Sequence, residues 1–162
     1  MSLLWDDDGG TGGGGGGGPC PPLPTRYTIV TFDTVNPEVS YSGGLRADDD
    51  TVYGLGLVYD GNWYYCAQDV GEVIALTVNA PGTTKYNRIR FRKAGAVRVK
   101  LYGNLGTVQT VDFDENAAPE FVQLTDWLNL AGQCGEYITS VDFRYNNSGL
   151  WAIDDVEFGT VP

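Results

Sequence analysis

The residue types in this chain exclude the commonest catalytic and zinc-binding chemistries. The chain has 162 residues and contains no histidine. Histidine is the commonest general base, so Ser-His-Asp and Cys-His catalysis are excluded. The three cysteines, Cys20, Cys66 and Cys134, have no spacing typical of a zinc site. We expect Cys66 and Cys134 to be buried thiols, with a disulfide between these two as the alternative in oxidising surroundings.

Two carboxylates two residues apart are the nearest thing to a catalytic pair. Asp112 and Asp114 would face the same side of a β-strand, an arrangement that the acid and base of a glycosidase could have. Paired acids are also common on solvent-facing strands, and nothing in the neighbouring sequence marks a cleft. Residues 9–18 are glycine except for Thr11, but they lack the Gly-Lys-Ser/Thr ending of a phosphate loop. We therefore expect a protein without enzymatic activity.

An aromatic run is the best candidate for binding a sugar. Trp63 and Tyr65 flank Tyr64 and follow Asp60 and Asn62, so aromatic rings stand next to hydrogen-bonding groups. In a β-rich domain, alternate members of such a run usually pack in the core. We therefore expect core packing for at least one of Trp63 and Tyr65, and sugar binding is the alternative. Trp127 and Trp151 are further candidates for a sugar platform.

Positive charge is concentrated in one short stretch of the chain. Seven of the ten basic residues lie in this stretch: Lys85, Arg88, Arg90, Arg92, Lys93, Arg98 and Lys100. Apolar residues alternate with the cations, which predicts a hairpin over 86–102 with one core face and one cationic face. The candidate partner-binding residues on that face are Arg88, Arg90, Arg92, Arg98 and Lys100. The alternatives are a solvated face neutralised by local acids and a face that docks an acidic partner, including a second copy of the chain.

The overall charge has the opposite sign. The formal net charge is −11, from 21 acidic and 10 basic residues, which disfavours nucleic acid and anionic membranes as partners. No run of 18 or more apolar residues is present, so we expect no membrane-spanning segment. The N-terminus also lacks the basic and long apolar regions of a signal peptide, which predicts synthesis and folding in the cytoplasm.

Apolar residues from Tyr27 onward recur with a period of two, which is typical of strands. Turn signals such as Asp60-Gly61-Asn62 separate the segments. The expected strands are 27–34, 51–59, 63–66, 72–79, 86–93, 96–102, 107–113, 120–125, 137–145 and 150–158. Eight to ten short strands at such spacing predict an antiparallel β-sandwich or barrel. One helical turn is expected at 126–131, with Asp126 as its N-cap.

The N-terminus differs from the rest of the chain in composition. Leu3, Leu4 and Trp5 form an apolar tip, followed by three aspartates, the glycine-rich run and a proline-rich stretch at 19–24. We expect residues 1–25 to be an extended Gly/Pro-rich attachment arm and residues 26–162 to be one folded domain. An exposed apolar tip is costly, so Leu3, Leu4 and Trp5 are candidates for burial against a partner.

Three strand sequences carry a resemblance to known domains. The run from Trp151 to Gly159, together with Ile29–Asp33 and Ile138–Phe143, resembles jelly-roll β-sandwiches of bacterial surface and phage structural proteins, many of them similar to carbohydrate-binding modules. The resemblance implies an all-β, antiparallel jelly-roll β-sandwich. In such domains the first and last strands pair at an edge that often holds a structural calcium. The matching residues here are Asp33, Asp154 and Asp155, and no other cofactor is expected.

Three functions are compatible with these observations. The leading expectation is a virion structural or accessory protein, such as a head decoration, cement or tail accessory protein. It would assemble in the host cytoplasm, be anchored to other virion proteins by its arm, and form a homo-oligomer. The alternative is a carbohydrate-binding or adhesion module at the cell surface or outside the cell. The third is a glycan hydrolase.

Overall fold

The fold is described by a computed structural model that covers most of the expected domain. The described residues are 20–21, 23–47, 64–67, 72–114, 122–146 and 151–161, and at 45–47 and 64–67 the backbone alone is described. Leu3, Leu4, Trp5 and Trp63 lie outside these residues. The division of the chain at residue 25 therefore stays a prediction.

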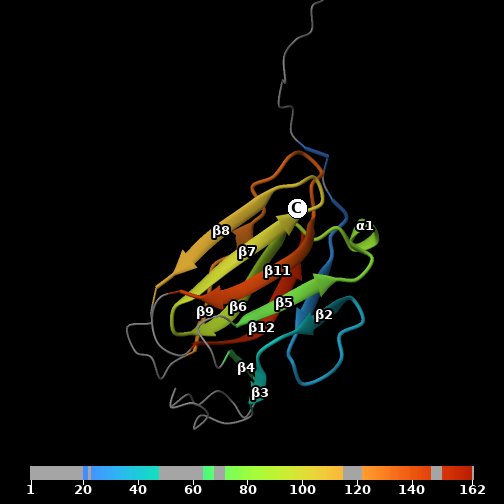
Figure 1. Cartoon of the computed structure of the whole chain (residues 1–162). Helices are drawn as coiled ribbons and strands as arrows, with labels where there is room; N and C mark the ends of the chain where they lie inside the picture. The colour runs from blue at the N-terminus through green and yellow to red at the C-terminus, as the bar shows by residue number, and fades with distance from the viewer. Residues whose placement is uncertain are drawn as a thin grey trace, which may run out of the picture.

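The described strands form two antiparallel sheets that face each other, shown as two layers in Figure 1. Sheet A contains β1 (Tyr27–Val30), β3 (Leu45–Ala47), β4 (Tyr64–Ala67), β6 (Arg88–Ala94), β9 (Gln123–Leu124), β10 (Leu128–Asn129) and β12 (Trp151–Gly159). Sheet B has the order β2 (Val39–Ser42), β5 (Val73–Val78), β11 (Ile138–Tyr145), β7 (Val97–Gly103) and β8 (Val108–Phe113). The expected all-β sandwich is therefore confirmed. The first and last strands pair as expected, with Tyr27 opposite Gly159 and Val30 opposite Val156.

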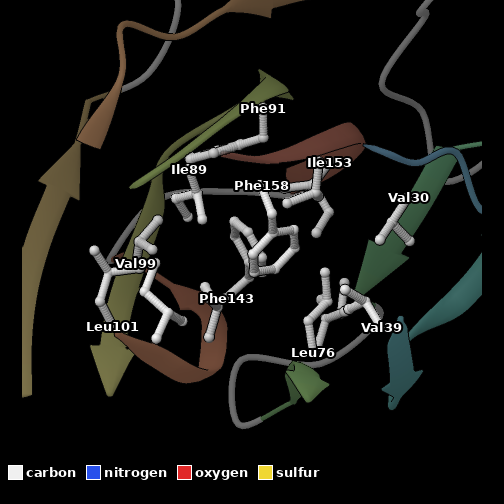
Figure 2. Close-up of a cluster of buried hydrophobic side chains, with 14 of the residues drawn as sticks. Val30, Val39, Leu76, Ile89, Phe91, Val99, Leu101, Phe143, Ile153 and Phe158 are labelled. Carbon is white, nitrogen blue, oxygen red and sulfur yellow. The ribbon is translucent and has the colours of Figure 1, made fainter. Parts of the chain in front are cut away.

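The core lies between the two sheets and follows from the alternation of side chains along the strands. Figure 2 shows Phe158 of sheet A and Phe143 of sheet B near the centre of this cluster, and both are fully buried. The pairing of β12 with β6 shifts register between Asp154 and Glu157, and Asp155 has a φ of 44°. This bulge changes the phase of β12, so that Ile153, Val156 and Phe158 all belong to the core.

The predicted hairpin over 86–102 is wrong. The strand β6 pairs with β9, β10 and β12 in sheet A, whereas β7 pairs with β8 and β11 in sheet B. The chain crosses between the sheets at Gly95, which has a φ of 77°, and at the buried Ala96. Arg88, Arg90 and Arg92 therefore lie on the opposite outer face of the sandwich from Arg98 and Lys100.

Two short elements also differ from the sequence-based expectations. Residues 128–129 form strand β10 and pair with β6 in place of the expected helical turn at 126–131. A one-turn helix, α1 (Pro81–Thr84), follows β5 and begins with proline, whose fixed φ suits the first helical position. The described residues contain no helix with the length and apolar character needed to cross a membrane.

The cysteine predictions need correction. Cys20 and Cys134 form a disulfide with a Cα–Cα distance of 5.3 Å, and Cys134 is exposed. The expected buried thiol at Cys134, and its alternative pairing with Cys66, are both wrong. Cys66 lies on β4, in the part described by its backbone alone. The disulfide joins the segment before β1 to the turn before β11, a contact between residues 114 positions apart that sequence spacing does not reveal.

Candidate functional site

The solvent-facing side of sheet B, which we call the outer face of sheet B, is the candidate site. Its residues alternate along each strand with buried core residues and occupy matching positions in the register of neighbouring strands. They are Ser40, Ser42, Val73, Ala75, Thr77, Arg98, Lys100, Tyr102, Val108, Thr110, Asp112, Ser140, Asp142 and Arg144. Small side chains cover β2 and β5, and the aromatic and charged groups lie on β7, β8 and β11.

Asp142 is the centre of the hydrogen bonding on this face. Its Oδ2 accepts a hydrogen bond from Tyr102 Oη at 3.0 Å and another from Arg144 Nη2 at 2.8 Å. Partial burial raises the pKa of Tyr102, and the hydrogen bond to the Asp142 carboxylate raises it further. The hydrogen bond to Asp142 also raises the pKa of Arg144. The arrangement places a phenol ring, a carboxylate and a guanidinium side by side, which are the groups that bind and orient sugar hydroxyls.

Two cations on β7 flank this centre. Arg98 donates to both oxygens of Asp112, from Nε at 2.6 Å and from Nη2 at 2.9 Å. This bidentate pair lowers the pKa of Asp112 and raises that of Arg98. Lys100 lies opposite Asp142 on β11 and Thr110 on β8. Of the five predicted partner-binding cations, this face holds Arg98 and Lys100.

The other three cations lie on the outer face of sheet A and are close to Trp127 or to acids. The guanidinium groups of Arg88 and Arg90 lie 4.2 Å and 4.7 Å from the centre of the Trp127 ring. Arg90 also forms a salt bridge with Glu157, and Arg92 Nε lies 3.3 Å from Asp155 Oδ2. Partner binding by these cations stays a prediction, but it would involve two separate faces.

The aromatic candidates are placed differently from one another. Trp151 is 1% exposed and belongs to the core, so it cannot be a sugar platform. Trp127 is partly buried, and its ring already contacts Arg88 and Arg90. Trp63 lies outside the described residues, and Tyr65 lies on β4 with its backbone alone described. Their assignment as sugar-binding or core residues stays a prediction.

The carboxylates near the terminal strands, which were candidates for calcium, have different surroundings. Asp154 is buried, and burial, then the neighbouring charges of Asp155 and Asp33, raise its pKa to about 8. Its Oδ1 accepts from the Asp155 backbone N–H at 2.8 Å, while Oδ2 is buried without a hydrogen-bond partner. Asp155 is turned toward Arg92. Among the described residues no three carboxylates or thiolates are grouped as a metal site, and calcium binding by Asp33, Asp154 and Asp155 stays a prediction.

The two residues considered for glycan hydrolysis, Asp112 and Asp114, both contact basic side chains, Asp112 through its carboxylate and Asp114 through its backbone carbonyl. The Asp112 carboxylate is held by Arg98, which lowers its pKa and disfavours a role as general acid. Asp114 follows the end of β8, and its carbonyl oxygen accepts from Lys93 Nζ at 2.7 Å. Lys93 and Asp114 line a recess of about 470 Å³ between β8 and β9. The buried Lys93 ammonium also donates to the Gly95 carbonyl at 3.0 Å.

Sequence reasoning missed Tyr102, Asp142 and Arg144 as candidate site residues. Each lies in a strand that the period-two pattern predicted, on the side that the pattern marks as polar. The strands β7 and β11 are neighbours in the sheet but lie about 40 residues apart in the sequence. A pattern of nearby residues therefore does not reveal that these side chains meet.

Comparisons with known proteins identify the fold. No protein-family model matches the sequence, and no curated protein is similar to it. Solved structures of family 29 carbohydrate-binding modules are similar to this chain. One has a TM-score of 0.56 and 12% identity over 85% of this chain and 90% of its own. A variant complexed with cellulohexaose has a TM-score of 0.56 and 12% identity, and covers 83% of this chain and 91% of its own.

A further variant, complexed with mannohexaose, has a TM-score of 0.55 and 11% identity, over 85% of this chain and 93% of its own. At this identity the likeness concerns the fold. It confirms the resemblance to jelly-roll domains of the carbohydrate-binding-module type that the strand sequences suggested. This chain therefore has a jelly-roll β-sandwich fold similar to that of family 29 carbohydrate-binding modules.

Proposed function

We propose that this protein is a carbohydrate-binding module without catalytic activity, and that a glycan lies on the outer face of sheet B. The observation that carries this proposal is the cluster of Tyr102, Asp142 and Arg144 on that face. Sugars are bound by a ring that packs on an aromatic side chain and by hydroxyls that pair with charged or amide groups. The cluster supplies both on two adjacent, rigid strands.

The similar solved structures support a carbohydrate-binding module over a virion structural protein. They are described as carbohydrate-binding modules, and two of them are in complex with hexasaccharides. Three expectations stay predictions. They are the burial of Leu3, Leu4 and Trp5 against a partner, the formation of a homo-oligomer, and the absence of nucleic-acid and membrane partners. In the proposed function, the arm would connect the module to its partner.

The disulfide supports a location outside the cytoplasm. Disulfides persist in oxidising compartments and are rare in the cytosol, where thiols are kept reduced. The bond between Cys20 and Cys134 therefore favours the cell surface or the extracellular space over assembly in a host cytoplasm.

The proposal is tested by binding measurements on the full chain. Isothermal titration calorimetry with cellohexaose and mannohexaose, and affinity electrophoresis in gels that contain polysaccharides, should detect binding. Asp142→Ala should weaken it roughly 10- to 100-fold, because hydrogen bonds to a charged group are worth about 1.5–3 kcal/mol. The variant also leaves Tyr102 and Arg144 without their shared acceptor.

Asp126→Ala is the matched control, since Asp126 is exposed and lies beside β9 and β10 of sheet A. It should bind as tightly as the wild type. Absence of binding to every glycan tested, or equal binding by Asp142→Ala and the wild type, would contradict the proposal. Thermal melting of both variants separates loss of binding from loss of fold.

A further inference from the structure

The outer face of sheet B carries an excess of positive charge on a strongly acidic protein. The face contains three cations and two acids, Arg98, Lys100 and Arg144 against Asp112 and Asp142, which leaves one positive charge in excess. The whole chain has a formal net charge of −11. A cationic face on such a protein is a local feature that composition does not explain.

The excess charge belongs to Lys100. Arg98 is paired with both oxygens of Asp112, and Arg144 is paired with Asp142. Lys100 lies opposite Asp142 in the register, but Asp142 Oδ2 already accepts from Tyr102 and Arg144. Within the described part of the chain, Lys100 makes no hydrogen bond or salt bridge. Lys100 lies on an inner strand of the sheet, and no acid among the described residues neutralises its ammonium group.

The position of Lys100 relative to Tyr102 suits a sugar that carries an acidic group. The two residues are two positions apart on β7, so their side chains emerge on the same face roughly 6.6 Å apart. A sugar ring that packs on Tyr102 would therefore bring its substituents close to the Lys100 ammonium. Arg144 lies on β11 opposite Arg98, and its charge is paired with Asp142.

We propose that the glycan bound on this face is anionic, with carboxylate or sulfate groups that pair with Lys100. This inference rests on the proposed carbohydrate-binding function and names the class of glycan. A neutral glycan would leave the Lys100 ammonium beside the ligand without a counter-charge, at a desolvation cost. Because the net charge of the protein repels polyanions, tight binding of an acidic glycan requires a local cationic site.

The test compares matched polymers with the full chain at fixed ionic strength. The probes are polygalacturonate for carboxylate, dextran sulfate for sulfate, and glucomannan and dextran as neutral glycans. At least one acidic glycan should bind about tenfold more tightly than the neutral ones. Comparison of the two acidic probes shows whether the site prefers carboxylate or sulfate groups. Lys100→Gln should remove that advantage, and Lys100→Arg should retain most of it.

Lys85→Gln is the control, because Lys85 follows α1 and lies outside the outer face of sheet B. It should leave every affinity unchanged. Equal affinity for neutral and acidic glycans, or an unchanged acidic affinity in Lys100→Gln, would overturn the inference while the carbohydrate-binding function stands. Equally tight binding of poly-glutamate, which contains no sugar, would also overturn it. Failure to bind any of the glycans would overturn the proposed function itself.

Discussion

Asp154 and Glu136 are both buried carboxyls, yet their pKa values shift in opposite directions. Asp154 receives one backbone hydrogen bond and lies near the negative charges of Asp155 and Asp33, so desolvation and repulsion raise its pKa. Desolvation acts on Glu136 as well, but hydrogen bonds from Thr107, Gln133 and Leu105 outweigh it and lower the pKa. The partners of each carboxyl, rather than its burial, decide which form the fold stabilises.

The environment of Asp154 leads to a prediction about calcium. If Asp33 and Asp154 hold a calcium ion, binding stabilises the fold by about 2.7 kcal/mol at a hundredfold excess over the dissociation constant. Chelation with EDTA should then lower the melting temperature of the wild type. Asp154→Asn should remove that sensitivity, because an amide supplies no negative charge to the ion.

Differential scanning calorimetry of both proteins, with EDTA and with added calcium, measures these effects. Asp126→Asn, at an exposed position, is the control and should respond to calcium as the wild type does. A melting temperature of the wild type that does not respond to calcium would exclude this site.

At the scale of elements, Glu136 joins two loops at one end of the sandwich. Its Oε1 accepts from the backbone N–H groups of Leu105 and Thr107 at 3.1 Å and 3.0 Å. Its Oε2 accepts from Thr107 Oγ1 at 2.7 Å and from the Gln133 N–H at 2.8 Å. A Cβ at Gly103 or Gly132 would lie 2.1 Å from this carboxylate, so the close approach of both loops requires glycine.

The carboxylate of Glu136 should make folding stability depend on pH. Because its folded-state pKa is lowered from 4.5, its contribution is present above the unfolded pKa and is lost as pH falls through the folded one. Glu136→Gln should lower the melting temperature at pH 7 by on the order of 5 °C, since an amide cannot accept from all the donors. The variant should also lose less stability than the wild type between pH 5 and about pH 3.

Urea unfolding at a series of pH values checks this prediction, with Asp126→Asn as the control for general acid effects. The other carboxylates of this acidic chain contribute to both proteins alike. Parallel pH profiles for wild type and Glu136→Gln would therefore rule out a stabilising role for the ionised form.

The strands show how far the sequence determines the fold. Period-two alternation predicted β5, β6, β7, β8, β11 and β12 within a few residues, because one side of each strand faces the core. The same alternation occurs whether two successive strands pair or belong to facing sheets. Thus 86–102 was predicted as a hairpin, and the crossing at Gly95 was not recognised.

The candidate site was harder to predict for the same reason. Lys100 and Arg98 were identified by charge alone and grouped with cations of the other sheet. Tyr102 and Asp142 were not identified, since their meeting depends on the pairing of β7 with β11. Residue types indicate a site only when the residues that form it are close in sequence. Here Tyr102 and Asp142 are 40 residues apart.

At the scale of the whole molecule, the disulfide fixes where the N-terminal segment leaves the domain. Cys20 lies seven residues before β1, and Cys134 lies in the turn that Glu136 holds. Arg26 is attached as well, since its backbone N–H donates to Thr160 Oγ1 at 3.0 Å. Any arm formed by the preceding residues would therefore start from a fixed point near the end of β12.

The disulfide should be a major contributor to stability. Joining residues 114 positions apart restricts the unfolded chain, and disulfides typically add about 2–4 kcal/mol to the free energy of unfolding. Cys134→Ser should therefore unfold at lower urea concentration than the wild type, and reduction should bring the wild type to the same midpoint. Because the variant has already lost the bond, reduction should leave its midpoint unchanged.

Peptide mapping without reduction should recover Cys20 linked to Cys134. Wild type in which Cys20 and Cys134 both react with a thiol reagent before reduction would refute the bond and, with it, the argument for an oxidising compartment.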